Sequence, residues 1–141
     1  MSEQNKAAVR RWFDEVWNQG RGDAIDELIS ERSVVHGLGP EVLRGPAGFR
    51  PFHAAYRNAF PDIRVQIEQM VAEGDVVAVR WRATGTHSGN GLGWAATQRP
   101  VDFSGMLFVR VEDGRLIEGW NSLDQLGMME QIGAVTVAPR A

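Results

Sequence analysis

Histidines and carboxylates are the residues of this chain best suited to proton transfer, because it contains no cysteine. The absence of cysteine excludes thiol nucleophiles, thiolate metal ligands and disulfides together. His36, His53 and His87 have neither the HExxH nor the facial-triad spacing, so their pattern predicts no metal site. The glycine-rich residues 89–93 do not join a strand to a helix and form no phosphate-binding fingerprint. We therefore expect acid/base chemistry that uses no cofactor.

Several ring side chains have positions that allow a binding role. His53 lies on the apolar stripe of a predicted helix, where it either reaches into a cavity or bonds a neighbouring helix, since buried polar atoms need partners. Trp81 and Trp120 lie on predicted strands. They either stack on a planar ligand or pack in the sheet core or at a subunit interface. Trp94 lies in a glycine-rich loop, and this position favours a role as a lid that covers a pocket.

Length and composition indicate one globular domain. The chain has 141 residues, of which 43% are hydrophobic and 23% charged, as is typical of folded proteins. We expect a single domain over residues 1–141 with its core at about 6–133. A net charge of −3 without a basic block argues against nucleic-acid binding. The sequence shows no long apolar run and no signal-peptide pattern, so we expect no membrane span and a cytoplasmic location.

The N-terminal part of the sequence predicts three helices that must position these side chains. Apolar residues from 9 to 17 recur at the helical period and predict a helix of about four turns that ends at Gly20. Asp23 is a good N-cap for a short second helix, and residues 33–36 follow as a short strand. A third helix over residues 46–60 is bounded by prolines.

The second half of the sequence alternates apolar and polar residues, which predicts strands with one buried face. These strands cover residues 63–67, 76–86, 101–111 and 115–123, and the last two are joined by an Asp-Gly turn typical of a hairpin. The expected fold is α+β: a cone-shaped barrel in which a curved, mostly antiparallel sheet wraps around about three N-terminal helices.

A sheet of this kind has an open end and an outer face. The open end is a natural pocket for a small molecule. Three helices are too few to cover both faces of the long strand at residues 76–86. Its apolar Val77, Val79 and Trp81 would therefore suit a subunit interface. We therefore expect a homodimer or a higher homo-oligomer.

A set of short motifs, in this order along the chain, resembles the SnoaL-like polyketide cyclases, which belong to the nuclear-transport-factor-2-like superfamily. The similarity runs from about Lys6 to Gly133. The motifs are Trp17-Asn18, Arg44-Gly45-Pro46, Ala59-Phe60-Pro61-Asp62, Gly85-Thr86-His87-Ser88-Gly89, the run from Asp113 to Trp120, and Asp124-Gln125-Leu126-Gly127.

The resemblance implies roles for two ionisable residues. Asp124, after the final strand, matches the acid/base residue of the cyclases, which would remove a proton from an activated carbon and return one to an alkoxide. An apolar pocket would raise the pKa of this carboxyl toward the working pH. Its alternative role is an N-cap of the terminal helix. His36 resembles a position that faces the cavity in relatives, and it is either a proton shuttle there or a core histidine.

The resemblance thus implies a cofactor-independent cyclase or isomerase that acts on an oxygenated, largely apolar molecule. Its strand at residues 101–111 contains no histidine, in contrast to several cyclases. One alternative is an epoxide hydrolase or hydratase that uses Asp102, Arg110 and Asp124, and another is a ligand-binding or dimerisation domain without turnover. The candidate catalytic residues are Asp124 and His36, and the candidate substrate-binding residues are His53, Tyr56, Trp81, Trp94, Ser104, Trp120 and Asn121.

Overall fold

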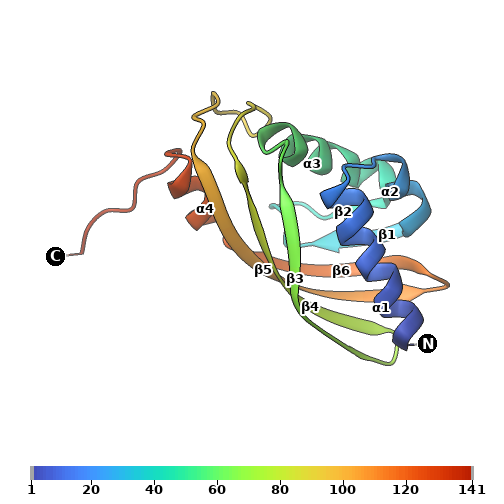
Figure 1. Ribbon diagram of the computed structural model, residues 1–141. Helices are drawn as coiled ribbons and strands as arrows, with labels where there is room; N and C mark the ends of the chain where they lie inside the picture. Colours follow the sequence, from blue (N-terminus) through green and yellow to red (C-terminus); the bar gives the residue numbers. More distant parts are fainter. Residues whose placement is uncertain (1, 141) are drawn as a thin grey trace.

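The computed structural model describes residues 2–140. Helices cover one face of a curved sheet, and the C-terminal segment extends away from the body (Figure 1). In chain order the elements are α1 (Ser2–Arg11), the π-helix η1 (Trp12–Asn18), α2 (Asp23–Leu28), β1 (Ile29–His36), β2 (Leu43–Arg44), α3 (Gly45–Ala59), β3 (Arg64–Glu73), β4 (Val76–Thr86), β5 (Pro100–Glu112), β6 (Arg115–Leu123) and α4 (Gln125–Gln131).

The strands form one sheet in the order β2-β1-β6-β5-β4-β3. The meander from β3 to β6 is antiparallel throughout, which confirms the predicted α+β fold. The sheet is curved and open. Strand β1 pairs with β6 in parallel and begins at Ile29, four residues before the predicted strand and directly after α2. Ile29 pairs with Leu116 of β6, and this pairing draws the residue after α2 directly into the sheet.

The predicted N-terminal helix changes its hydrogen-bond pattern at Trp12. Its first part is α-helical, but η1 is a π-helix, which the apolar spacing did not reveal. The end of η1 is tied to the edge strand β3: Asn18 Oδ1 accepts a bond from the Val65 amide at 2.6 Å, and Asn18 Nδ2 donates to the Val65 carbonyl at 3.0 Å. The side chain of Asn18 thereby takes the place of a neighbouring strand.

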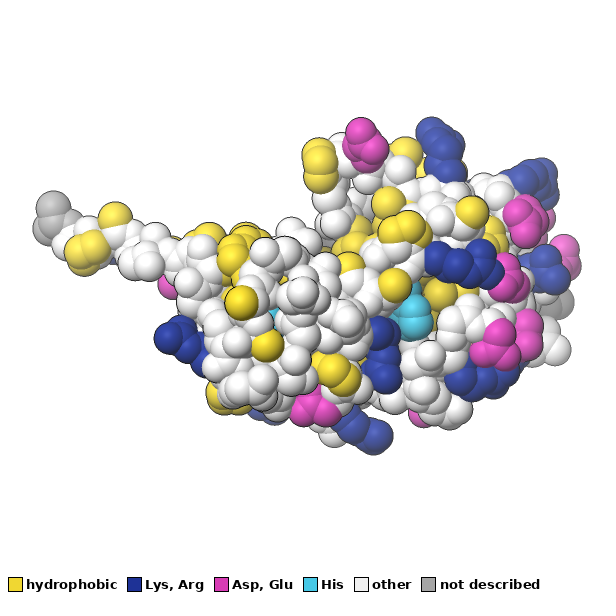
Figure 2. Space-filling view, turned by 90° about the horizontal axis from the view of Figure 1, so that it is seen from above, with side chains coloured by type: hydrophobic (Ala, Val, Ile, Leu, Met, Phe, Trp, Pro, Cys, Tyr) yellow, Lys and Arg dark blue, Asp and Glu magenta, His cyan; other side chains and the backbone are white. Residues whose placement is uncertain are grey.

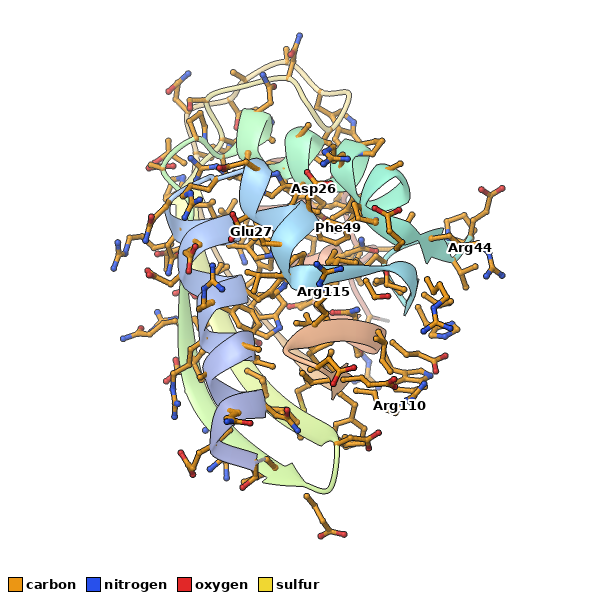
Figure 3. The ribbon with its side chains drawn as sticks, turned by 90° about the vertical axis from the view of Figure 1, so that its right-hand side faces the viewer. Asp26, Glu27, Arg44, Phe49, Arg110 and Arg115 are labelled. Carbon is orange, nitrogen blue, oxygen red and sulfur yellow. The ribbon has the colours of Figure 1, made fainter. Side chains whose placement is uncertain are left out.

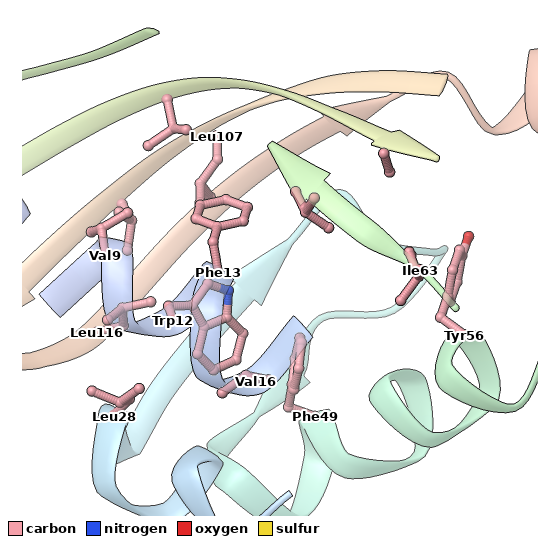
Figure 4. Close-up of a cluster of buried hydrophobic side chains, with 14 of the residues drawn as sticks. Val9, Trp12, Phe13, Val16, Leu28, Phe49, Tyr56, Ile63, Leu107 and Leu116 are labelled. Atoms are coloured by element: carbon pink, nitrogen blue, oxygen red, sulfur yellow. The ribbon is translucent and has the colours of Figure 1, made fainter. Parts of the chain in front are cut away.

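The core lies between the helices and the inner face of the sheet. Trp12 of η1 packs against Phe49 of α3, with ring centroids 4.9 Å apart, and Leu107 of β5 lies on the sheet side of this cluster, whereas Tyr56 lies farther along α3 beside Ile63 (Figure 4). Helix α3 begins with a proline in its first turn, as predicted. Its apolar face is buried against this cluster.

The outer face of the sheet differs from the expectation. Val77 and Val79 are buried in the core, and Trp81 packs against the core as well, because the inner face of β4 is covered by the helices. On β5 and β6, three apolar side chains are exposed instead: Met106 and Phe108 are each 60% exposed, and Trp120 is 43% exposed. We call these three residues the outer patch.

Charged side chains are spread over the remaining surface. Seen from above, many of them gather at the end of the molecule opposite the C-terminal segment (Figure 2). Among residues 2–140, no helix is both long and apolar enough to cross a membrane.

Candidate active site

A cavity of about 90 Å³ lies between the helices and the inner face of the sheet. One water needs about 10–15 Å³ on such a scale, so the cavity accepts a ring-sized fragment. Its wall is mostly apolar and rich in aromatic side chains, as is usual for small-molecule sites. The aromatic lining residues are Trp12, Phe13, Trp17, Phe49, Phe52, Tyr56, Trp81 and Phe103.

Besides the tryptophans, four lining residues have polar side chains: Ser33, Tyr56, Asn121 and Glu118, whose carboxylate is held by His36. Asn121 Nδ2 donates to the backbone carbonyl of His36 at 3.2 Å, which fixes the amide and leaves its oxygen for a ligand. Tyr56 Oη accepts a bond from Gln125 Nε2 at 3.4 Å and keeps its own proton to donate. Burial raises the pKa of Tyr56, so this hydroxyl stays protonated.

The position of Asn121 depends on a glycine in the adjacent loop. Gly37 has φ +89°, and a Cβ at this position would collide with the Asn121 carbonyl oxygen. Only glycine therefore lets the chain leave β1 this close to β6. The close approach keeps the His36 carbonyl within reach of the Asn121 amide.

Of the predicted substrate-binding residues, Tyr56, Trp81 and Asn121 line the cavity. Trp81 packs edge-on against Phe103, with ring centroids 6.0 Å apart. Its indole occupies the space above Gly105, where a Cβ would overlap the ring. The part of the cavity wall that Trp81 forms thus depends on both a tryptophan and a glycine.

His36 lies on the opposite, outer face of the sheet. Its Nε2 lies 2.8 Å from Glu118 Oε2, and its ring stacks on Trp120 with centroids 5.6 Å apart. Arg110 approaches the same carboxylate at 3.7 Å. Figure 3 shows Arg110 well away from Phe49, which lies among the interior side chains. Glu118 also borders the cavity, but its carboxylate is engaged by these outer-face groups.

Asp124 caps α4 and lies outside the cavity. Its Oδ1 accepts a hydrogen bond from the Gly127 amide at 2.9 Å, so the predicted N-cap interaction is present. The residue is exposed and lines a shallow groove together with Ser104. Trp81 and Leu123 border both the groove and the cavity. The groove and the cavity therefore lie on opposite faces of the sheet at this point.

The remaining histidines and Trp94 are also outside the cavity. His53 Nε2 donates to the Val16 carbonyl at 2.7 Å, so this buried ring bonds a neighbouring helix, one of its two predicted roles. Burial lowers the pKa of His53. His87 is buried beneath the loop that follows β4 and bonds Thr97. Trp94 is 37% exposed in this loop.

The charged network of the hydrolase alternative does not form. Asp102 and Arg110 lie eight positions apart on β5, which separates them by about 27 Å in a strand. Asp102 instead pairs with Arg82, which lowers the pKa of the carboxyl. Within residues 2–140 no group of three or more acidic or histidine side chains could hold a metal ion.

Ser33 is a polar cavity residue that the sequence interpretation missed. Alternation along β1 places Ser33 on the same face as Val35, and both line the cavity. This alternation was a usable signal.

The chain resembles known proteins along most of its length. Its sequence matches the family of SnoaL-like polyketide cyclases over residues 7–132. Aklanonic acid methyl ester cyclase DauD from Streptomyces sp. (strain C5) is 30% identical over 130 residues, which cover 89% of this chain and 79% of DauD. A SnoaL-like protein from Jannaschia sp. CCS1 is 29% identical with a TM-score of 0.86, covering 96% of this chain and 95% of that one. IdmH from Streptomyces antibioticus is 29% identical with a TM-score of 0.80, and the coverages are 92% and 99%.

Proposed function

Because this chain belongs to the SnoaL-like polyketide cyclase family, we propose that it binds an oxygenated, largely apolar polyketide-like molecule and cyclises or isomerises it without a cofactor. The observation that carries this proposal is the aromatic cavity with its few isolated polar groups. Such a wall takes up fused or conjugated rings, while Tyr56 and Asn121 orient the oxygens of the ligand. The relative DauD is named for a substrate of this class, the methyl ester of aklanonic acid.

Cyclisation by an intramolecular aldol reaction needs one group that removes a proton from carbon and returns it to the new alkoxide. We propose Asp124 for this role. Its support is its place directly after Leu123, a cavity residue, at the end of the last strand.

The direct test is Asp124→Asn, assayed for cyclisation of aklanonic acid methyl ester. Asparagine preserves the cap of α4 but cannot exchange a proton, so turnover should fall by about 10²- to 10⁴-fold while folding and ligand binding persist. Asp102→Asn removes another exposed carboxylate of the same sheet and should leave turnover unchanged. Parental turnover by the Asp124 variant would show that the acid/base assignment is wrong.

Ligand binding without turnover is the second candidate function. It is favoured by the absence, among the residues described, of any carboxylate directed into the cavity: the carboxylate of Glu118 is bound on the outer face, and Asp124 borders only the groove. Binding of the same ester by the parental chain, with no product after prolonged incubation, would support this alternative over the cyclase.

We also propose that a second copy of the chain covers the outer patch. A twofold axis along β5 would bring Met106 and Phe108 of one copy against those of the other. The patch is thus self-complementary in hydrophobicity.

A further inference from the structure

We propose that the Ser33 hydroxyl binds an oxygen of the ligand inside the cavity. Ser33 is 3% exposed, and its Oγ has no hydrogen-bond partner among residues 2–140. The same residue lines the cavity. An unpaired buried hydroxyl is costly and uncommon in folded proteins. The inference rests on the proposed function only in taking this cavity as the ligand site.

The strand geometry explains why this hydroxyl faces the ligand. Val34 and His36 of β1 pair with Glu118 and Trp120 of β6, and His36 is bound there on the outer face. Because successive side chains alternate, Ser33 is directed to the inner face. A register shift between Ile29 and Val34 interrupts the pairing with β6 at this point of the strand.

The chemistry of the wall defines the class of ligand. A serine hydroxyl both donates and accepts, so a ketone, an ester carbonyl or a hydroxyl would satisfy it, whereas a hydrocarbon would not. No lysine or arginine of the described chain lines the cavity. An ionised carboxylate would therefore lose its water without gaining a cation. The favoured ligand is a neutral ring compound with an oxygen on the enclosed ring.

A matched pair of probes tests the hydroxyl without any need for turnover. 1-Tetralone and tetralin share one carbon skeleton, but only the former has a carbonyl oxygen. Their dissociation constants can be measured from the fluorescence of Trp12 and Trp17, which line the cavity. In Ser33→Ala the preference for 1-tetralone over tetralin should fall by roughly 2- to 12-fold.

The control is Ser30→Ala on the same strand, whose hydroxyl accepts a bond from the Arg32 amide outside the cavity. Its preference between the probes should equal that of the parental chain. Ser33→Ala should also keep the parental melting temperature, since it removes an unpaired group. A lower melting temperature would instead reveal a structural role for this hydroxyl and overturn the proposal.

Two further outcomes also overturn the proposal: an unchanged preference in Ser33→Ala, or failure of both probes to bind the parental chain. The result is separable from that of the cyclase assay. If the parental chain makes no product but the probe preference shifts as expected, the proposed activity fails and the role of Ser33 stands. If it cyclises the ester and the preference does not shift, only the role of Ser33 fails.

Discussion

The side chain of Asn18 clamps η1 to β3, and its removal should destabilise the fold measurably. Asn18→Ala removes the two bonds, of 2.6 and 3.0 Å, to the amide and carbonyl of Val65. Each hydrogen bond contributes about 0.5–1.5 kcal/mol net, so the free energy of unfolding should fall by about 1–3 kcal/mol. For a domain of this size, that corresponds to a decrease in melting temperature of roughly 4–12 °C.

The same clamp holds the end of the helical segment that carries Trp12 and Trp17 into the cavity. Asn18→Ala should therefore also weaken ligand binding, measured by titration with 1-tetralone. Thermal unfolding followed by circular dichroism gives the stability change. Asn90→Ala, an exposed asparagine in the loop after β4, is the matched control and should change stability by less than about 0.5 kcal/mol. If Asn18→Ala and Asn90→Ala have the same melting temperature, the clamp contributes nothing to stability and the reasoning is refuted.

Two further predictions concern pH and association. Burial lowers the pKa of His53 in the folded chain below its unfolded value of about 6.5, so the unfolded state binds more protons and stability falls as pH drops below that value. His53→Gln should flatten this decline in melting temperature between pH 7.5 and 5, and an unchanged slope would contradict the assignment. The outer patch should hold two copies together at micromolar concentration, and Phe108→Lys should leave a folded 15.6 kDa species in sedimentation equilibrium. A parental chain that sediments only at that mass would rule out the association.

The sequence by itself determined the class of fold and the extent of most elements. Period-two alternation and the Asp-Gly turn are local signals, and they located the antiparallel meander from residue 64 to residue 123. The prolines around α3 likewise determine its ends, because they restrict their own backbone and that of the preceding residue. The parallel pairing of β1 with β6 joins segments about 85 positions apart and has no such local signal.

The tertiary structure alone decided which face of each strand lines the cavity. Alternation shows that two side chains share a face, but it does not show whether helices cover that face. A register shift in β6 next to Leu116 also reverses the alternation, so that Leu116 and Gly119 both line the cavity. Because side chains alternate along β1, His36 lies outside, against Glu118, while Ser33, three positions earlier, lies inside. Asp124 had two roles open from its sequence position, and the hydrogen bond to Gly127 establishes only the capping one.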